Sequence, residues 1–313
     1  MATLVWRYLT ALLYYRTSAR CVALAEALET VSHDRLTRLL QADWSGHILL
    51  ELACRTLFVR ERGYLLLDDT VIPKPLATAI ENFAWVFSSQ ARKPVYGLSL
   101  VLLIWTNGTL RVPLGVRLWR RGGPSQIELA LARLSYARHR LRCRPAYVLF
   151  DAWSPSKRLL KRICDYGGYF VCRLKKPRRF NGQARRAYRR PPYGTGSGWL
   201  TGGLKVLVVS YGAKYYATTR LTLPAPEVRR VYRYRAQMEE VIRVCKSQLG
   251  LTGWQARSER AQLHHLTCCF VACCVLERER HARQLSIDKR KRQLSFKGRS
   301  WALPALERLK GAA

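Results

Sequence analysis

The first half of the chain alternates between short apolar runs and turn signals, the pattern of a β-sheet. One run ends abruptly at Asp68-Asp69-Thr70, and a later run ends at Asp151. Asn107-Gly108 separates two of the runs and is a strong hairpin signal. We therefore expect an antiparallel meander of three strands and then, after an amphipathic helix at 126–141, a fourth and buried strand. The four predicted strands cover residues 64–67, 95–105, 110–119 and 146–150.

Apolar residues at helical spacing dominate both ends of the chain. They predict short helices before residue 60 and two long helices, at 227–249 and 259–283. A basic helix at 155–166 and a strand at 168–174 complete the central part. The expected organisation is a helical N-terminal region at 1–60, a first part of the core at 61–174, a basic loop and β-strand insertion at 175–225, C-terminal core helices at 226–283, and a basic, weakly ordered tail at 284–313.

Residues 21–40 predict two short helices separated by a tight turn. Ser32 can cap the second helix, and Asp34 suits its first turn. This arrangement fits a DNA-binding helix-turn-helix in which Arg35 and Arg38 face DNA. It fits an ordinary helical hairpin equally well, so both interpretations stay open.

Charge narrows the class of partner. The chain has 55 Lys and Arg against 20 Asp and Glu, a formal net charge of +35. Such a chain repels itself unless a polyanion neutralises it, and nucleic acid releases counterions when its phosphates are bound. Composition alone would also fit a ribosomal or packaging protein. We expect no signal peptide and no membrane helix, and ten cysteines without a disulfide rhythm favour a reducing cytoplasm.

The acids at the strand ends carry candidate chemistry. Asp68 and Asp151 each follow an apolar run, so both carboxylates should leave the sheet at its edge. Carboxylate oxygens are suitable ligands for Mg²⁺, and two such ions about 4 Å apart assist phosphoryl transfer by activating the attacking oxygen and stabilising the leaving oxygen. Asp residues at such positions also commonly cap turns, so the strand ends by themselves do not decide between the two roles.

The predicted helix at 227–249 adds four polar groups on one stripe. At about 100° per residue, Tyr232, Arg235, Glu239 and Lys246 fall within about 60° of one another. The stripe places an acid among cations, which suits a metal ligand beside a phosphate backbone. A solvated face of i,i+4 ion pairs is the alternative. Glu240 falls about 100° away from Glu239 and lies off the stripe.

This spacing resembles the Y-R-E-K signature of bacterial insertion-sequence transposases of the DDE type, and the segments 68–70 and 149–153 resemble them too. The likeness spans residues 60–280 in the right order. It implies a ribonuclease-H-like core, an α/β mixed sheet flanked by helices, with the first acid on the first strand, the second on the fourth and the Glu on a late helix. It implies that Asp68, Asp151 and Glu239 are catalytic and hold two Mg²⁺ or Mn²⁺ ions. The family pattern resembles Asp-any-Thr and favours Asp68, with Asp69 as the alternative. Only one of the two can point into the site, because neighbouring strand residues face opposite ways.

The resemblance also implies partners and an activity. We expect double-stranded DNA, both element ends and target, bound by a homodimer, with Tyr232, Arg235 and Lys246 positioning phosphates. Water and then a DNA 3′-hydroxyl would be the nucleophiles. A transposase-derived DNA-binding protein without activity and a metal nuclease without strand transfer stay open. We interpret the Cys- and His-rich segment 264–274 as a buried helix rather than a zinc site, because no Cys-x2-Cys pair has a distant partner.

Overall fold

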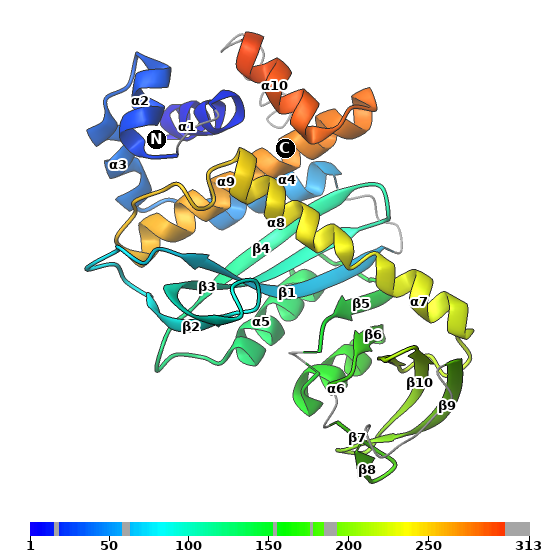
Figure 1. The fold of residues 1–313 in the computed structure, drawn as a ribbon. Coiled ribbons are helices and arrows are strands. Elements are labelled where there is room, and N and C mark those ends of the chain that lie inside the picture. Colours follow the sequence, from blue (N-terminus) through cyan, green and yellow to red (C-terminus); the bar gives the residue numbers. More distant parts are fainter. Residues whose placement is uncertain (16–18, 58–62, 153–154, 176–177, 185–192, 298–313) are drawn as a thin grey trace.

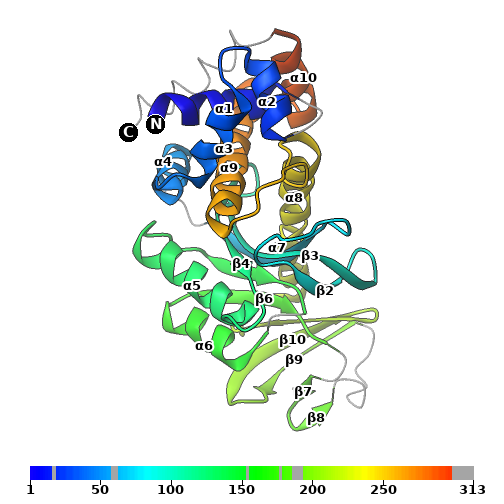
Figure 2. The same ribbon diagram turned by 90° about the vertical axis from the view of Figure 1, so that its left-hand side faces the viewer.

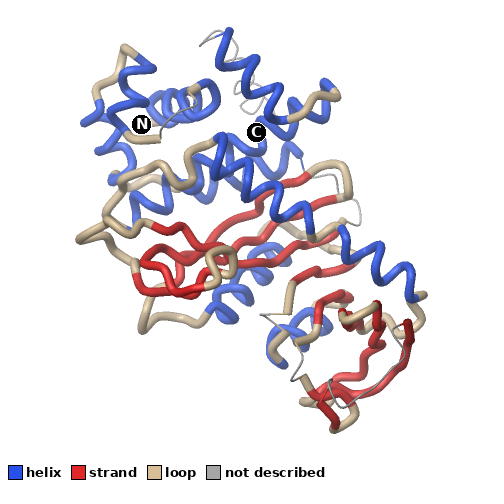
Figure 3. The backbone as a smooth tube through the Cα atoms, in the orientation of Figure 1, coloured by secondary structure: helices blue, strands red, loops and turns tan. Residues whose placement is uncertain are grey.

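The structure is a computed structural model that describes residues 1–15, 19–57, 63–152, 155–175, 178–184 and 193–297. Its centre is a mixed sheet of eleven strands in the order β2-β3-β1-β5-β6-β11-β10-β9-β7-β8, with β4 also paired to β3. Figures 1 and 3 show helices packed around this sheet, with strands β7–β10 at the end away from β2 and the N-terminal helices. This arrangement confirms the predicted fold class, a ribonuclease-H-like mixed sheet flanked by helices.

The strands are β1 Tyr64–Pro73, β2 Ala84–Ser88, β3 Lys93–Thr106, β4 Arg111–Trp119, β5 Tyr147–Phe150, β6 Tyr169–Arg173, β7 Arg179–Phe180, β8 Gln183–Ala184, β9 Tyr193–Leu200, β10 Leu204–Tyr211 and β11 Lys214–Thr218. The helices are α1 Ala2–Tyr14, α2 Cys21–Leu28, α3 His33–Gln41, α4 Gly46–Leu57, α5 Gln126–His139, α6 Lys157–Asp165, α7 Ala225–Arg233, α8 Ala236–Gln248, α9 Glu259–Arg283 and α10 Ile287–Lys297.

The apolar runs become the buried middle of the sheet. β1 pairs antiparallel with β3 and parallel with β5, and β5 pairs parallel with β6. Runs of buried residues such as 65–67, 98–105 and 147–150 are continuous because both faces of the sheet are covered. Figure 2 shows α5 and α6 on one face and α7 and α8 on the other.

Helix α9 lies at the centre of the helical layer. It is apolar around most of its circumference, as expected for a buried helix, and it contacts α1, α3, α4, α8, α10 and β4. Its cysteines are buried free thiols, which agrees with the buried-helix interpretation. Among the described residues, no helix has the length and hydrophobicity to cross a membrane.

The structure corrects four expectations about elements. The sequence pattern missed β2, so β5 is the fifth strand along the chain, although it lies directly beside β1. The predicted helix at 227–249 is two helices, α7 and α8. Ser32 stands at the N-cap of α3, but its side chain makes no capping hydrogen bond.

The fourth correction concerns the tail, where residues 287–297 form α10 instead of a weakly ordered segment. Two of its cations have buried partners. Arg290 pairs with Glu279 of α9 at 2.7 Å, and the ammonium of Lys291 donates to the backbone oxygens of Leu12 and Tyr15. These contacts fix the helix against α9 and the end of α1. Residues 298–313 of the predicted tail lie outside the described residues.

Candidate active site

Strand register brings the two predicted Asp residues side by side. Leu67 of β1 is paired with Phe150 of β5, so Asp68 and Asp151 are the next residues on adjacent parallel strands. Neighbouring strands lie about 4.8 Å apart, which places the two carboxyl groups side by side. The expectation that the strand ends before Asp68 is wrong, because β1 continues to Pro73 and Asp68 is paired with Leu102 of β3. Asp68 is buried and Asp151 is partly exposed.

Arg235 joins these two acids to the predicted glutamate. Its Nη2 atom lies 2.6 Å from Oδ2 of Asp68 and 3.8 Å from Oδ2 of Asp151, and its Nη1 atom lies 2.9 Å from Oε1 of Glu239. Burial alone would lower the pKa of Arg235, but the negative charges of Asp68 and Asp151 raise it. The three acids therefore converge on one guanidinium group.

The junction between α7 and α8 places Arg235 in this position. Tyr234 and Arg235 keep right-handed helical dihedral angles, but the backbone bonds close three-residue steps, from Tyr234 N to Val231 O and from Arg235 N to Tyr232 O. Such a tightened turn interrupts a helix without reversing it. The ring of Tyr234 stacks on Tyr64, at the start of β1, with 4.5 Å between ring centroids. The stripe predicted for one continuous helix thus spans two helices, and all four of its side chains still face the sheet.

Tyr232 and Lys246, the first and last residues of the stripe, contact different parts of the site. Tyr232 reaches Asp151 at the end of β5, and Lys246 reaches β1. The hydroxyl of Tyr232 donates to Oδ1 of Asp151 at 3.4 Å, and burial, then the charge of Asp151, raises the pKa of this phenol. Lys246 donates to the hydroxyl of Thr70 at 3.0 Å and to the Val71 carbonyl at 3.2 Å. Burial lowers the pKa of Lys246. Both side chains therefore border the acids at fixed positions.

Asp69 points to the other face of the sheet. Its carboxylate lies 3.5 Å from the side-chain amide of Gln126 in α5, and burial raises its pKa. Alternation along β1 explains the difference, because successive side chains face opposite sides of a strand. Of the two neighbouring acids, Asp68 is the one that contacts Arg235.

Sequence reasoning missed Arg173, which extends the row formed by Asp68 and Asp151 to a third strand. Cys172 of β6 is paired with Phe150, so Arg173 occupies the position equivalent to Asp151 on the next strand. Its Nη1 atom lies 3.8 Å from Oδ1 of Asp151. The signal was available, since Arg173 follows an apolar run as Asp68 and Asp151 do. Trp153, part of the segment that resembles transposases, lies outside the described residues.

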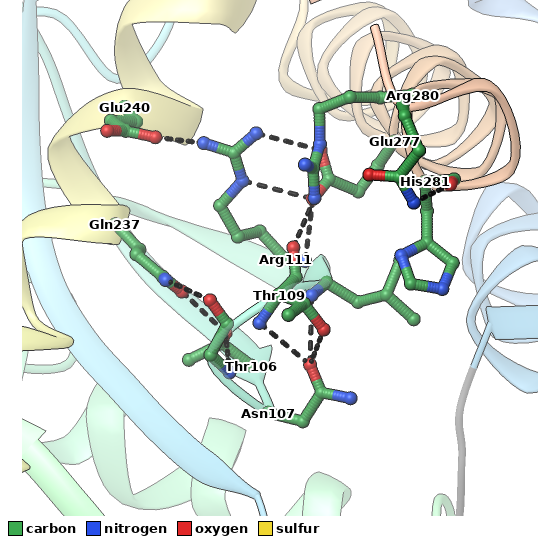
Figure 4. A network of polar contacts seen from close by, with 12 residues as sticks. Thr106, Asn107, Thr109, Arg111, Gln237, Glu240, Glu277, Arg280 and His281 are labelled. Atoms are coloured by element: carbon green, nitrogen blue, oxygen red, sulfur yellow. Dashed lines mark hydrogen bonds and ion pairs between the residues drawn. The ribbon is translucent and has the colours of Figure 1, made fainter. Parts of the chain in front are cut away.

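A second polar network holds α8 from its other side (Figure 4). Gln237 accepts a hydrogen bond from the Thr106 hydroxyl at 2.5 Å and donates to the Gly108 carbonyl at 2.7 Å. Arg111 of β4 bonds Glu240 of α8 and Glu277 of α9. Glu240, which lies off the predicted stripe, is therefore a structural partner of the β3–β4 hairpin and not part of the acidic cluster.

The donor set fits a hard divalent cation. Asp68, Asp151 and Glu239 each contact Arg235, and carboxylate oxygens are the donors that Mg²⁺ prefers. Within the described ranges, no three His, Cys, Asp or Glu side chains are grouped closely enough to hold a metal ion as they stand. Arg235 supplies the positive charge among the three carboxylates, where the resemblance implied metal ions.

The other predicted contacts lie away from this cluster. Arg35 and Arg38 are exposed on α3, which packs against α9. Lys74 also lies away from the cluster, over the ring of Trp254, and donates to the backbone oxygen of that residue. Burial, then the charge of Arg20, lowers the pKa of Lys74 to about 8. Residues 185–192 of the basic insertion lie outside the described residues.

Comparison with known proteins finds similarity to a family model and to solved structures. The sequence model of the family described as "Transposase DDE domain" matches residues 60–275. A cryo-EM structure of the piggyBac transposase synaptic complex with hairpin DNA is similar in fold, with a TM-score of 0.59 at 12% sequence identity, over 98% of this chain and 72% of that chain. No curated protein matches the sequence.

Proposed function

Because this chain belongs to the transposase DDE domain family, we propose that it cuts DNA at the ends of an insertion sequence and joins the freed strand to target DNA. The observation that carries the proposal is the convergence of Asp68, Asp151 and Glu239 on Arg235. The formal net charge of +35 supports double-stranded DNA as the substrate. A homodimer that holds two element ends is part of the proposal.

The proposed reaction has two phosphoryl transfers. In the first, a water oxygen bonds to a phosphorus of the DNA backbone, the bond from phosphorus to the 3′ oxygen breaks, and that oxygen leaves as a 3′-hydroxyl. In the second, the 3′-hydroxyl bonds to a phosphorus of target DNA and displaces the 3′ oxygen there. Each transfer moves negative charge onto the phosphate oxygens, and fixed cations beside them stabilise this charge.

The cations of the site have distinct places in this scheme. Arg235 and Lys246 are held beside the acids by the contacts described above, so both cations already lie where the phosphate would bind. The phenol of Tyr232 stays protonated, because its pKa is raised, and it can donate a hydrogen bond. Arg173 is a further candidate, since it lies next to Asp151 at the partly exposed end of β6.

Asp68, Asp151 and Glu239 would hold Mg²⁺ or Mn²⁺, in two positions. When bound, these ions supply charge neutralisation at the phosphate and a lowered pKa for coordinated water. Arg235 then has to give up part of its contact with the carboxylates. A phosphate oxygen offers it an equivalent partner, because the guanidinium fork matches phosphate as well as carboxylate.

The test uses the full chain, Mg²⁺ or Mn²⁺, and DNA that carries the ends of the element encoding it, with a circular target. We expect metal-dependent nicks at the ends and joined products. Cleavage without joining would indicate a metal nuclease, and DNA binding without either would indicate an inactive transposase-derived protein. The Asp68→Asn variant should lose both reactions, whereas Asp69→Asn, on the opposite face, should keep them.

A further inference from the structure

The hairpin formed by β2 and the first residues of β3 carries large apolar side chains into solvent. Trp85 is 72% exposed and Phe87 is 64% exposed. In the antiparallel register Trp85 is opposite Tyr96, and Phe87 is opposite Pro94. Directly opposed residues share a face of the ribbon, so these four side chains form one apolar stripe. The rings of Trp85 and Tyr96 are 5.9 Å apart at the centroids.

Such a stripe on an edge strand requires an explanation. Exposed edge strands invite pairing with other chains, and proteins usually protect them with charges or prolines. β2 stands at the end of the sheet and has its aromatic residues on the exposed positions of its alternation. Contiguous exposed apolar surface of this kind commonly marks an interaction site.

The ribbon is anchored on the catalytic side of the sheet. Its base is Gly97, which is paired both with Ala84 of β2 and with Pro73 at the carboxyl end of β1. A Cβ atom at Gly97 would lie 2.4 Å from the Ile72 carbonyl oxygen, so only glycine allows this close approach. The ribbon therefore continues from β1 beyond Asp68, and Figure 2 shows it projecting from the sheet.

Strand geometry gives the distance from the candidate active site. Five residues of β1 separate Asp68 from Pro73, and one more step along β3 reaches the level of Trp85. At about 3.3 Å per residue the separation along the strands is about 20 Å for Trp85, and two further residues give about 26 Å for Phe87. These lengths correspond to about six to eight base pairs at about 3.4 Å each.

Charge identifies the occupant of the stripe. Residues 84–97 contain Arg92 and Lys93 and no acid. A second copy of this chain would bring a net charge of +35 against the same basic ribbon, which is unfavourable without a polyanion. DNA supplies both the negative backbone for Arg92 and Lys93 and flat apolar bases for Trp85 and Phe87. Stacking of bases on aromatic side chains tolerates any sequence, because every base has a π-face.

We propose that the Trp85–Phe87 stripe binds unstacked bases of the DNA substrate, about six to eight base pairs from the phosphate at Asp68. The inference rests on the proposed function for its choice of DNA, and it adds a contact with bases to the phosphate contacts at the acids. Aromatic side chains that enter a groove between base steps favour DNA that is already unpaired, kinked or easily unstacked. The ribbon would thus favour locally opened DNA.

The experiment compares binding of the full chain to a paired duplex and to the same duplex with a two-nucleotide mismatched bubble, at one salt concentration, by fluorescence anisotropy. We expect the wild type to bind the bubble more tightly. The double variant Trp85→Ala with Phe87→Ala should lose that preference while binding the paired duplex within about twofold of wild type. One lost stacking contact corresponds to about 5- to 150-fold in affinity.

Two controls separate stacking from other effects. Trp199→Ala removes an aromatic side chain of β9 that is 54% exposed, and it should leave the preference unchanged. Trp85→Phe should keep part of the preference, and Arg92→Gln with Lys93→Gln should weaken binding to both duplexes equally. The inference is overturned if the double variant keeps the preference, if wild type shows none, or if the double variant changes only the oligomeric state in sedimentation. Cleavage is not part of this measurement, so failure of the proposed function is a separate result.

Discussion

At the scale of single residues, Arg235 has two competing sets of partners. In the structure its guanidinium neutralises Asp68, Asp151 and Glu239, whereas the proposed reaction needs the same carboxylates for metal. A charge-assisted hydrogen bond is stronger than a neutral one, so the guanidinium should compete with added cations. Arg235, which we propose binds phosphate, would then also limit metal binding before DNA arrives.

This competition predicts that Arg235→Gln binds Mn²⁺ more tightly than wild type in the absence of DNA, by roughly tenfold if one charge-assisted contact is released. Electron paramagnetic resonance of free Mn²⁺ during titration measures the change directly. Arg243→Gln on α8 serves as the matched control, because Arg243 pairs with Asp288 and does not touch the three acids. Equal or weaker Mn²⁺ binding by Arg235→Gln would show that the guanidinium supports the site instead of competing for it.

A second residue-scale prediction concerns the two neighbouring glutamates of α8. Glu239→Gln removes one charged oxygen donor from the cluster and should lower DNA cleavage by more than about 100-fold, beyond the usual effect of losing an outer-shell partner. DNA binding should stay within about twofold, because no cation is lost. Gel-based cleavage and anisotropy measure the two properties.

Glu240→Gln is the matched variant for this prediction. Glu240 faces Arg111 of the β3–β4 hairpin and not the acidic cluster. We expect it to keep cleavage, with a small loss of thermal stability. Loss of cleavage in Glu240→Gln, with Glu239→Gln active, would mean that the other face of α8 carries the chemistry.

At the scale of elements, the buried runs could be read from the sequence, and the full length of β1 and the contacts between distant segments could not. Apolar runs located β1, β3, β4 and β5, and the acids that directly follow two of these runs, Asp68 and Asp151, lie side by side. The sequence pattern did not predict β2, because its aromatic residues Trp85 and Phe87 lie at the exposed positions. In most strands the exposed positions are polar and the apolar side chains are buried. The break between α7 and α8 has no glycine or proline to mark it, since Tyr234 and Arg235 keep helical angles. Both this break and the strand register are needed to bring Arg235 among the acids. The position of Arg235 could therefore not be predicted from the sequence.

Helix α9 carries a buried histidine, His265, whose lowered pKa gives a prediction about the pH dependence of stability. Burial lowers the pKa of His265 from 6.5 to about 4, and its ring nitrogens are hydrogen-bonded to Tyr8 and to the Gly250 carbonyl. Between pH 6.5 and 4 the unfolded chain binds this proton and the folded chain does not. Stability is therefore lost as pH falls through that range, by about 3 kcal/mol for this group.

The measurement is the free energy of unfolding in urea between pH 7 and pH 4, for wild type and His265→Gln. The variant should be less stable at pH 7, because a buried hydrogen-bonded side chain is replaced, and its stability should fall less steeply toward pH 4. His281→Gln, at an exposed position near the end of the same helix, is the control and should follow wild type. Parallel curves for wild type and His265→Gln would contradict the assignment.

Helix α3 carries the prediction about sequence recognition. Arg35 and Arg38 are both exposed and have no place in the acidic cluster, as expected for residues that read DNA. Replacing both by Ala should reduce the ratio of affinities for element ends over random DNA, measured at one salt concentration. A plain loss of positive charge would weaken both affinities equally. An unchanged ratio would identify α2 and α3 as an ordinary helical hairpin.

At the scale of the whole molecule, the excess of 35 positive charges divides into cations that serve folding and cations that remain for DNA. Arg290 belongs to the first group, since it is buried and paired with Glu279. Lys175 belongs to the second, since it is exposed where the basic insertion begins. Each phosphate contact contributes about 0.9 to the slope of log affinity against log salt. Lys175→Gln should therefore lower that slope by about one and weaken binding to all sequences alike.

Arg290→Gln should leave the slope unchanged and lower the midpoint of thermal unfolding, because Glu279 loses a buried partner. Binding titrations at four salt concentrations, with melting curves for both variants, test whether Lys175 binds DNA and Arg290 stabilises the fold. Equal slopes for Lys175→Gln and wild type would place the DNA path elsewhere on the surface.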